Sequence, residues 1–490
     1  MNFSDMKFIR KFSMNMCKCL EIPLSKMTFT SDFTVTDRGD LYPLIEKTGN
    51  ITEHVSPSGY TTVGEGSTER LLASFFPYAT YKMKITSLNG AAGFVFKSNT
   101  AKAEVMIEND DWETVVSFFD GERSNKTHLP SEIGEDFEFI VSLRPHCFDI
   151  YASVKGAIYH VVSEVSDPFR ESHAISFYET AKVHVKMVGN ATVVGAGSCI
   201  DCGIGQADIR PFKYENGDLI MENGRVFLSI SSRLAKGSYQ SVLSWLPGTA
   251  DFKMEGAIFY SHGEKSTKIH SEVAASYVFN RMDNKWHVWV RDGSAGHVLS
   301  YGCFDYDIRY GLNIVDVTPL PLMTEENLDD TVLLGKKGDE DPDFTYDAAR
   351  KKWLFTLCRI DTAHHKYRYY FFESDRPDKD SKFVGLGPVG EETGGSILRL
   401  DGKFFFACGN DFHAVSDYRV YEWGKFDTFT NLKCDFPDGG FRGWATIMPI
   451  RYGSRMRYFW LTFDRTLMSK IHNWSYGNLY CFEAEGYFKA

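Results

Sequence analysis

The sequence predicts an all-β chain in which an N-terminal β-sandwich of jelly-roll type precedes a five-bladed β-propeller. Three observations predict this fold class. The chain has 490 residues, which exceeds one ordinary hydrophobic core and favours two domains. Short segments of alternating apolar and polar residues, separated by turn residues, fill most of the length, and helix signals are few. From about residue 206 onward, a strand–turn–strand unit recurs five times.

Residues 1–26 are mildly basic with scattered apolar side chains, and we expect them to be an extension outside both domains. They lack the continuous apolar run and the small-residue cleavage site of a secretory leader. The expected location is therefore cytoplasmic. A periplasmic or secreted location is the alternative if a leader has been trimmed from the chain.

Residues 27–197 are predicted to form the β-sandwich. Turn residues at short, regular intervals separate the predicted strands, as is typical of an antiparallel sandwich. These strands include Tyr81–Thr86, Ala92–Lys97, Ala103–Glu108, Glu138–Leu143, Phe148–Ala152 and Val183–Met187. The order of the segments Ala92–Lys97, Val115–Asp120 and Phe148–Val154 resembles concanavalin-like modules of lectin or laminin-G type. Such modules bind glycans or pack against a catalytic neighbour, and both roles stay open.

Residues 206–490 are predicted to form the propeller, after a glycine-rich link at residues 193–205. The spacing of the units, roughly 50–65 residues, is that of propeller blades. The predicted first strands are Leu219–Met221, Val273–Phe279, Phe344–Tyr346, Ser396–Leu400 and Ala445–Ile450. The predicted second strands are Arg225–Ile230, Trp286–Val290, Trp353–Leu357, Phe404–Ala407 and Tyr458–Thr462. A closed ring of blades protects the sheet edges and leaves a central funnel.

Charged residues open the five predicted first strands, where they should converge on the funnel: Asp218, Glu272, Asp341, Glu392 and Arg442. Gathering several carboxylates away from water is unfavourable, and sites tolerate it where chemistry needs it. Trp444 adds a ring on which a sugar could stack. His270, two residues before Glu272, either faces the funnel or is an ordinary strand-end histidine.

Two segments resemble the five-bladed propeller glycoside hydrolases, the group that contains arabinanases, β-xylosidases and fructan hydrolases. The segment Asp341-Pro-Asp-Phe-Thr-Tyr-Asp347 is similar to their Asp-Pro-x-x-Phe-x-Asp motif, and the segment from Glu392 to Gly402 is similar to their general-acid segment. The resemblance implies that Glu392 donates the proton and that Asp341 tunes its pKa and holds the sugar.

The resemblance leaves two assignments open. The base is either Glu272, one unit before Asp341, or Asp218 in the first unit. Glu391 competes with Glu392 for the acid, because the segment reads Glu-Glu-Thr-Gly-Gly where the family has Glu-Gly-Pro. Glycosidic cleavage needs one protonated carboxyl and one ionised carboxylate. The resemblance favours an exo-acting, inverting enzyme on a pentoside or furanoside, with no cofactor beyond an allowed structural calcium.

Composition excludes several other classes of function. The formal net charge is −11 without a long basic run, which argues against a nucleic-acid partner. No stretch approaches the roughly 20 apolar residues of a membrane span. The ten cysteines are expected to be reduced structural thiols, although Cys17-Lys-Cys19 and Cys199-Ile-Asp-Cys202 together offer four thiolates to zinc. The resemblance to the propeller glycoside hydrolases implies an oligosaccharide or glycoside as the partner. A glycoside phosphorylase that binds phosphate through Arg442 and Arg359, and a non-catalytic glycan-binding protein, are the alternatives.

Overall fold

The described chain is almost entirely β-structure, which confirms the all-β class. The computed structural model describes residues 3–28, 43–56, 59–110, 113–134, 136–235, 237–263, 267–293, 298–320, 339–361, 364–412, 415–434, 443–463, 476–486 and 488–489. Helix within these ranges is confined to α1 (Ile175–Tyr178) and to single 3₁₀ turns at Phe3–Asp5, Leu24–Lys26 and Asp167–Phe169. No helix in the described ranges has the length and apolar character to cross a membrane.

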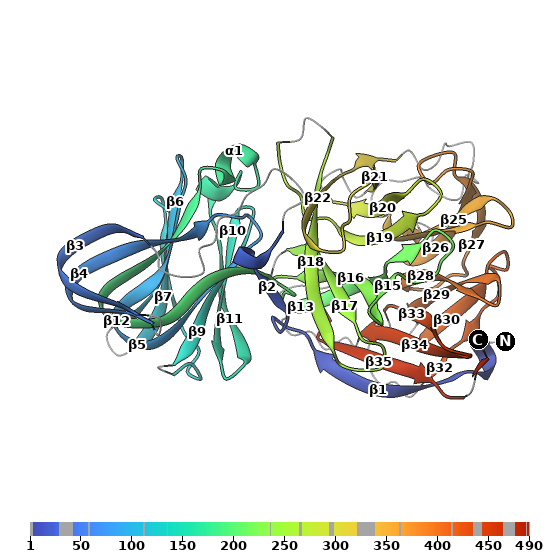
Figure 1. Cartoon of the computed structure of the whole chain (residues 1–490), viewed down its shortest axis with the longest axis horizontal. Coiled ribbons are helices and arrows are strands. Elements are labelled where there is room, and N and C mark those ends of the chain that lie inside the picture. Colours follow the sequence, from blue (N-terminus) through green and yellow to red (C-terminus); the bar gives the residue numbers. More distant parts are fainter. Residues whose placement is uncertain are drawn as a thin grey trace.

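Five sheets, antiparallel except for a few pairs at their edges, form the five blades of a β-propeller, at the right of Figure 1. The inner strands are β13 (Gly205–Pro211), β19 (Val273–Asn280), β24 (Glu340–Asp347), β28 (Glu392–Leu400) and β33 (Thr446–Tyr452). The second strands are β16 (Arg225–Arg233), β20 (Lys285–Asp292), β25 (Lys352–Asp361), β29 (Lys403–Phe412) and β34 (Arg455–Phe463). The third strands are β17 (Ser238–Trp245), β21 (Val298–Phe304), β26 (Lys366–Ser374), β30 (Val415–Glu422) and β35 (Asn478–Ala484).

Further strands complete the blades. The outer strands of the first four blades are β18 (Phe252–Ser261), β23 (Thr318–Pro319), β27 (Lys382–Leu386) and β31 (Thr430–Asn431). Five more strands pair at blade edges: β14 (Lys213–Tyr214), β15 (Met221–Glu222), β22 (Gly311–Asp316), β32 (Lys433–Cys434) and β36 (Phe488–Lys489).

The inner strand of blade 1 is not the predicted one. The prediction placed it at Leu219–Met221, but β13 pairs with β16 and starts at Gly205. Between them the chain makes an excursion, in which β14 adds to the sheet of blade 2 and β15 pairs with the start of β16. This excursion separates β13 from its partner β16 along the chain. A prediction that pairs neighbouring segments therefore selects Leu219–Met221 in place of β13.

The N-terminus belongs to the propeller and is not an outlying extension. Strand β1 (Lys7–Asn15) pairs antiparallel with β35 and supplies the fourth strand of blade 5, beside which both chain ends lie in Figure 1. Phe8 is fully buried and its ring meets that of Trp460 edge-on at 5.5 Å. The first and last parts of the chain thus share one sheet, which closes the ring of blades.

A buried cluster of charged side chains lies between the inner strands of the propeller. The carboxylate of Asp343 on β24 accepts hydrogen bonds from Lys213 Nζ (2.8 Å), from Ser276 Oγ and from the backbone N–H of Ile397 (2.6 Å). Two of these donors belong to the sheet of blade 2 and the third to β28 of blade 4. Burial alone would raise the pKa of Asp343, but Lys213 and Arg210 hold this pKa below its ordinary value.

Eleven strands of the N-terminal region are hydrogen-bonded into one sheet. They are β2 (Glu21–Pro23), β3 (Leu44–Ser56), β4 (Gly59–Ser74), β5 (Thr80–Lys97), β6 (Lys102–Asp110), β7 (Glu113–Phe119), β8 (Ser124–His128), β9 (Phe137–Arg144), β10 (Cys147–Val154), β11 (Ala157–Val165) and β12 (Lys182–Asp201). The two predicted strands Tyr81–Thr86 and Ala92–Lys97 are halves of the single strand β5, which pairs with β9 at one end and with β6 at the other.

The two branches of this sheet contact each other through their aromatic side chains. Phe118 of β7 lies 5.4 Å from Phe148 of β10, and Phe96 of β5 lies 5.2 Å from the same ring. Strands β7 and β10 are not hydrogen-bonded neighbours, so the sheet folds over its own core. A sandwich of two separate sheets stays a prediction.

The folded sheet packs directly on the propeller. Tyr78 stacks on Phe259 of β18 at 4.9 Å, and its hydroxyl donates to the backbone carbonyl of Ile269 at 3.1 Å. The N–H of Ile175 donates to the carbonyl of Thr267 at 2.7 Å. These contacts lie beside the start of β19 and place residues of the N-terminal sheet at the mouth of the funnel.

Candidate active site

The inner strands of the first four blades carry a β-bulge at the same position. In each, the register shifts just after the first paired residues. The residue inside the bulge has a left-handed backbone, with φ of +57° at Asp208, +56° at Ala274, +50° at Asp341 and +64° at Gly394. Trp444, just before β33, has φ of +68°. Bulges redirect side chains and are common beside active sites, and left-handed non-glycine residues are uncommon elsewhere.

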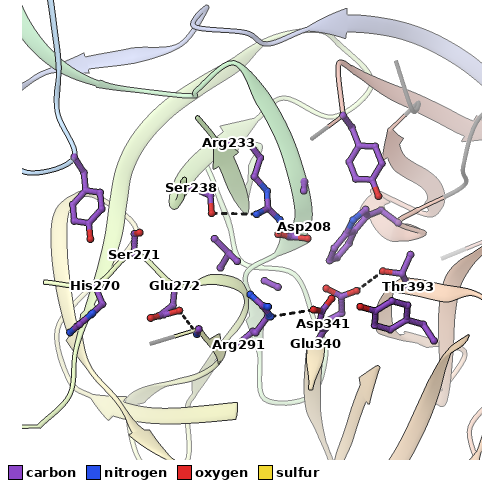
Figure 2. Close-up of a pocket in the computed structure, with 18 of the residues that line it drawn as sticks. Asp208, Arg233, Ser238, His270, Ser271, Glu272, Arg291, Glu340, Asp341 and Thr393 are labelled. Carbon is purple, nitrogen blue, oxygen red and sulfur yellow. Dashed lines mark hydrogen bonds and ion pairs between the residues drawn. The ribbon is translucent and has the colours of Figure 1, made fainter. Parts of the chain in front are cut away.

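A cavity of about 530 Å³ lies at these bulges. All five blades contribute to its wall, and Tyr78, Pro145 and His173 from loops of the N-terminal region line it as well. Its carboxylates come from the first four blades: Asp208, Glu272, Glu340, Asp341 and Glu391. Arg233 and Arg291 also line it, and Figure 2 shows both guanidinium groups among the carboxylates.

Asp208 is held by a cation. Nη2 of Arg233 donates to its Oδ2 at 3.0 Å, and Nη1 of the same guanidinium donates to Ser238 Oγ at 3.3 Å (Figure 2). Asp208 is 5% exposed. Burial raises the pKa of Asp208, Arg233 opposes this rise, and the Asp341 carboxylate adds to it. Asp208 and Asp341 are therefore close enough to interact electrostatically.

Glu340 and Asp341 are consecutive in the chain, yet both line the cavity. A regular strand would send them to opposite faces, and the bulge at Asp341 removes that alternation. Asp341 Oδ2 accepts hydrogen bonds from Thr393 Oγ1 (2.7 Å) and from the N–H of Gly394 (2.9 Å). Burial, followed by the neighbouring Asp341 carboxylate, raises the pKa of Glu340 to about 7. The Nε of Arg291, 3.4 Å from Glu340, only partly offsets this.

Glu272 and His270 lie at the blade 2 side of the cavity. Glu272 Oε2 accepts a hydrogen bond from the N–H of Gly293 at 2.6 Å (Figure 2). Burial, followed by the nearby His262, lowers the pKa of His270 to about 4. His262, His270 and Glu272 bring one ligand atom each within 4.8 Å of one another, which makes them the group among the described residues that could hold a metal ion.

Seven of the eight sequence-predicted site residues lie in the described part of the chain, and five of these seven line the cavity. Glu272, Asp341, Glu391, His270 and Trp444 line the cavity. Arg442 lies outside the described residues. The Glu391 carboxylate pairs with Lys366 Nζ at 2.7 Å.

Glu392 and Asp218 do not line the cavity. The Glu392 side chain is fully buried on the other face of β28, where Arg419 Nη1 (2.9 Å) and the Tyr421 hydroxyl donate to its Oε1. Burial raises the pKa of Glu392, and these hydrogen bonds oppose the rise. Asp218 is exposed in the turn after β14, hydrogen-bonded to Asn216. The predicted positions were wrong because strand alternation turns Glu392 away and because β13, not the Asp218 segment, is the inner strand.

Sequence reasoning missed Asp208, Arg233, Arg291 and Glu340. One signal for Asp208 was available in the sequence. Asp208 is followed two residues later by the charged Arg210, just as Asp341 is followed two residues later by Asp343. In both segments the first residue lies in the bulge and the second points to the propeller axis. Nη1 of Arg210 lies 3.8 Å from Oδ1 of Asp343, so the two axial charges meet. Arg233, Arg291 and the residues from the N-terminal sheet carry no such signal, because tertiary packing alone brings them to the cavity.

Trp444 is one of four aromatic residues that line the cavity. It is 1% exposed, and the Arg210 guanidinium lies 5.0 Å from its ring. Tyr367, Tyr78 and Tyr476 add further rings to the lining. Aromatic faces next to carboxylates and guanidinium groups suit a polar ligand with an apolar face.

Together, the five sheets and the cavity at their inner-strand ends define a five-bladed β-propeller with a carboxylate-lined funnel. No family model and no curated protein match the chain. The α-L-arabinofuranosidase from Podospora anserina in complex with cellotriose is 9% identical, with a TM-score of 0.37 over 57% of this chain and 97% of that one.

Two further solved structures give similar values. A thermostable family-43 glycoside hydrolase is 13% identical, with a TM-score of 0.38 over 58% of this chain and 94% of that one. The levansucrase of Bacillus subtilis is 11% identical, with a TM-score of 0.40 over 58% of this chain and 85% of that one. Since each TM-score lies below 0.5, the propeller assignment rests on the five sheets of this chain.

Proposed function

We propose that the chain is a glycoside hydrolase whose catalytic carboxyl groups lie in the propeller funnel. One observation carries the proposal: a single cavity gathers five carboxyl groups, and one of them, Glu340, has its pKa raised to about 7 beside a second, Asp341. Hydrolysis of a glycosidic bond requires a carboxyl that stays protonated near neutral pH and a carboxylate that is ionised.

Glu340 is the proton donor in this proposal, and Asp341 sets its charge state. Asp208, in the equivalent bulge of blade 1, is the second carboxylate, which activates water or attacks the sugar. Arg233 holds it in place through a 3.0 Å hydrogen bond. Separations of roughly 6.5–9.5 Å and 5–5.5 Å between the two carboxyl groups correspond to inversion and retention respectively. We expect inversion, and the anomeric configuration of the first sugar product measures this outcome.

The substrate in this proposal is the non-reducing end of an oligosaccharide or a simple glycoside. The contribution of Tyr78, Pro145 and His173, from outside the propeller, to the lining supports an exo-acting pocket rather than an open groove. Arg233 and Arg291 offer donors to sugar hydroxyls, whereas the Trp444 ring is 1% exposed and offers little surface for stacking. A pentoside or furanoside remains the expected sugar.

The test compares Glu340→Gln with Asp218→Asn on a panel of aryl glycosides and oligosaccharides. Glutamine keeps the shape of the side chain but cannot donate the proton, so kcat/KM on unactivated oligosaccharides should fall about 10²–10⁴-fold. The loss should be much smaller on aryl glycosides with good leaving groups, which need little protonation. Asp218→Asn changes an exposed turn carboxylate and should leave both rates unchanged. Full activity of Glu340→Gln on oligosaccharides would contradict the assignment.

Phosphorolysis is the second candidate, favoured by the two arginines in the cavity. Arg359, which was predicted to bind phosphate, instead donates two hydrogen bonds to the buried carboxylate of Asp339. Arg233 and Arg291 take its place as candidate phosphate ligands. Turnover that depends on inorganic phosphate and yields a sugar phosphate identifies a phosphorylase. Saturable glycan binding without turnover across the panel identifies a non-catalytic binding protein.

A further inference from the structure

A cluster of imidazole and carboxylate groups lies at the blade 2 end of the cavity. It consists of His262, directly after β18, and of His270 and Glu272, directly before β19. One ligand atom from each lies within 4.8 Å of the other two. The backbones of Tyr260 and His270 exchange both of their hydrogen bonds, at 2.9 and 2.8 Å. This bridge fixes the two histidines next to each other, with ring centroids 4.6 Å apart.

A second layer of side chains orients the cluster. The Asp292 carboxylate lies 3.3 Å from Nδ1 of His262, is itself fully buried, and accepts a hydrogen bond from Ser300 Oγ at 2.7 Å. The N–H of Gly293 holds Glu272 Oε2. A carboxylate on one imidazole nitrogen fixes the tautomer in which the other nitrogen carries the lone pair, which is the arrangement that supports histidine ligands in metal sites.

We propose that His262, His270 and Glu272 bind a divalent transition-metal ion, with zinc as the ion that best fits the donor set. Two nitrogen donors and one carboxylate oxygen match zinc and related first-row ions. Calcium takes oxygen ligands, so this site differs from the structural calcium that the sequence allowed. Three protein ligands leave a coordination position open.

The location gives the ion a place in the cavity wall. His270 and Glu272 both line the cavity, and His173 of the N-terminal sheet packs edge-on against His270 with ring centroids 5.7 Å apart. The open position can take a water molecule or a hydroxyl group of a ligand in the cavity. The site also lies where the N-terminal sheet meets the propeller, so a bound ion would join the strand ends of blades 1 and 2 at that boundary.

The experiment titrates the chelator-treated, full-length protein with zinc and, separately, with cobalt and calcium. Calorimetry should give one zinc per chain with a Kd in the micromolar range or below, and no comparable heat with calcium. His262→Gln should weaken zinc binding by at least about 10-fold, the range seen when a metal site loses support. His128→Gln, which alters a 72%-exposed histidine far from the cluster, should bind zinc as the wild type does.

Cobalt absorption provides a second measurement that does not depend on the folding of a variant. Nitrogen and oxygen ligation gives visible d–d bands without the strong near-ultraviolet bands of a cobalt–thiolate bond. Thiolate bands would assign the metal to the cysteines and overturn the proposal. Equal zinc affinity of wild type and His262→Gln, preferential binding of calcium, or the absence of zinc binding to the folded wild type would also overturn it.

Discussion

Asp208 and Asp341 occupy the same position in two different blades, each as the left-handed residue inside an inner-strand β-bulge. Their φ angles are +57° and +50°, and the register shift beside each spans the same number of residues. The propeller repeat therefore presents two carboxylates to one cavity from blades that are not neighbours in the ring. Asp341 raises the pKa of Asp208 and also that of Glu340, which makes it the electrostatic link between the two proposed catalytic groups.

The first prediction concerns the charge of Asp341. Asp341→Asn removes a negative charge that raises the pKa of Glu340, so this pKa should fall below its value of about 7. An acid catalyst must be protonated, so activity is lost as pH rises through its pKa. The alkaline limb of the kcat/KM profile should therefore move to lower pH in the variant. Asp218→Asn serves as the matched control, and an alkaline limb that stays in place in Asp341→Asn would exclude Glu340 as the acid.

The second prediction concerns the buried pair of Glu392 and Arg419. Glu392→Gln removes one of the two carboxylates that pair with the Arg419 guanidinium inside blade 4, the other being Asp417, and breaking a buried pair costs up to about 3–5 kcal/mol. Glu422→Gln removes a carboxylate from partly exposed pairs with Lys403 and Lys425, and should cost at most about 1 kcal/mol. Urea denaturation measures both. At a temperature where it is folded, Glu392→Gln should keep its turnover, and near-complete inactivity of the folded variant would restore Glu392 as a catalytic group.

The third prediction concerns closure of the propeller by β1. Phe8→Ala empties a fully buried site against Trp460, and such truncations cost about 3–5 kcal/mol. Lys11→Ala, on the same strand, removes only a partly exposed ion pair with Glu483 and should cost at most about 1 kcal/mol. The unfolding transition of the propeller in urea reports the difference. Equal stability of the two variants would show that β1 is dispensable for the fold.

The fourth prediction concerns the glycine in the blade 4 bulge. A Cβ at Gly394 would lie 2.6 Å from the Cα of Trp444, and the backbone there has φ of +64°. Gly402 has a similar φ of +78° in a turn, but a Cβ there would meet nothing within 4 Å. Gly402→Ala should cost about 1–2 kcal/mol from backbone strain alone.

Gly394→Ala should cost a further ~1–3 kcal/mol from overpacking. It should also reduce turnover, because the Gly394 N–H holds Asp341 and the clash displaces Trp444. Denaturation and kinetics on both variants separate the two effects. If the Gly394 and Gly402 variants prove equally stable and active, the close approach to Trp444 has no functional consequence.

Much of the architecture is local and could be predicted from the sequence. Alternating apolar residues and polar turns identified four of the five inner strands and all five second strands, because each blade is a hairpin built from neighbouring segments. The prediction failed at blade 1, where the excursion between β13 and β16 separates hairpin partners in the chain. It also failed at β1, whose partner β35 lies at the far end of the chain. Local sequence patterns do not predict pairing between strands that are far apart in the chain.

The sequence by itself determined the all-β class, the five-fold repeat and Asp341 as a residue of the funnel. These follow from the short-range periodicity of strands and from the position of a charge within a repeated unit. Glu272 and Glu391 were also predicted from the sequence, but only the tertiary structure decided whether Glu340, Glu392 and Asp208 share the cavity with Asp341. A bulge turns Glu340 toward it, ordinary alternation turns Glu392 away, and Asp208 reaches it from β13, a strand that the sequence pattern did not identify. The physical reason is that a one-residue irregularity in a strand reverses the direction of a side chain, and the stability of that irregularity depends on contacts with the neighbouring blades.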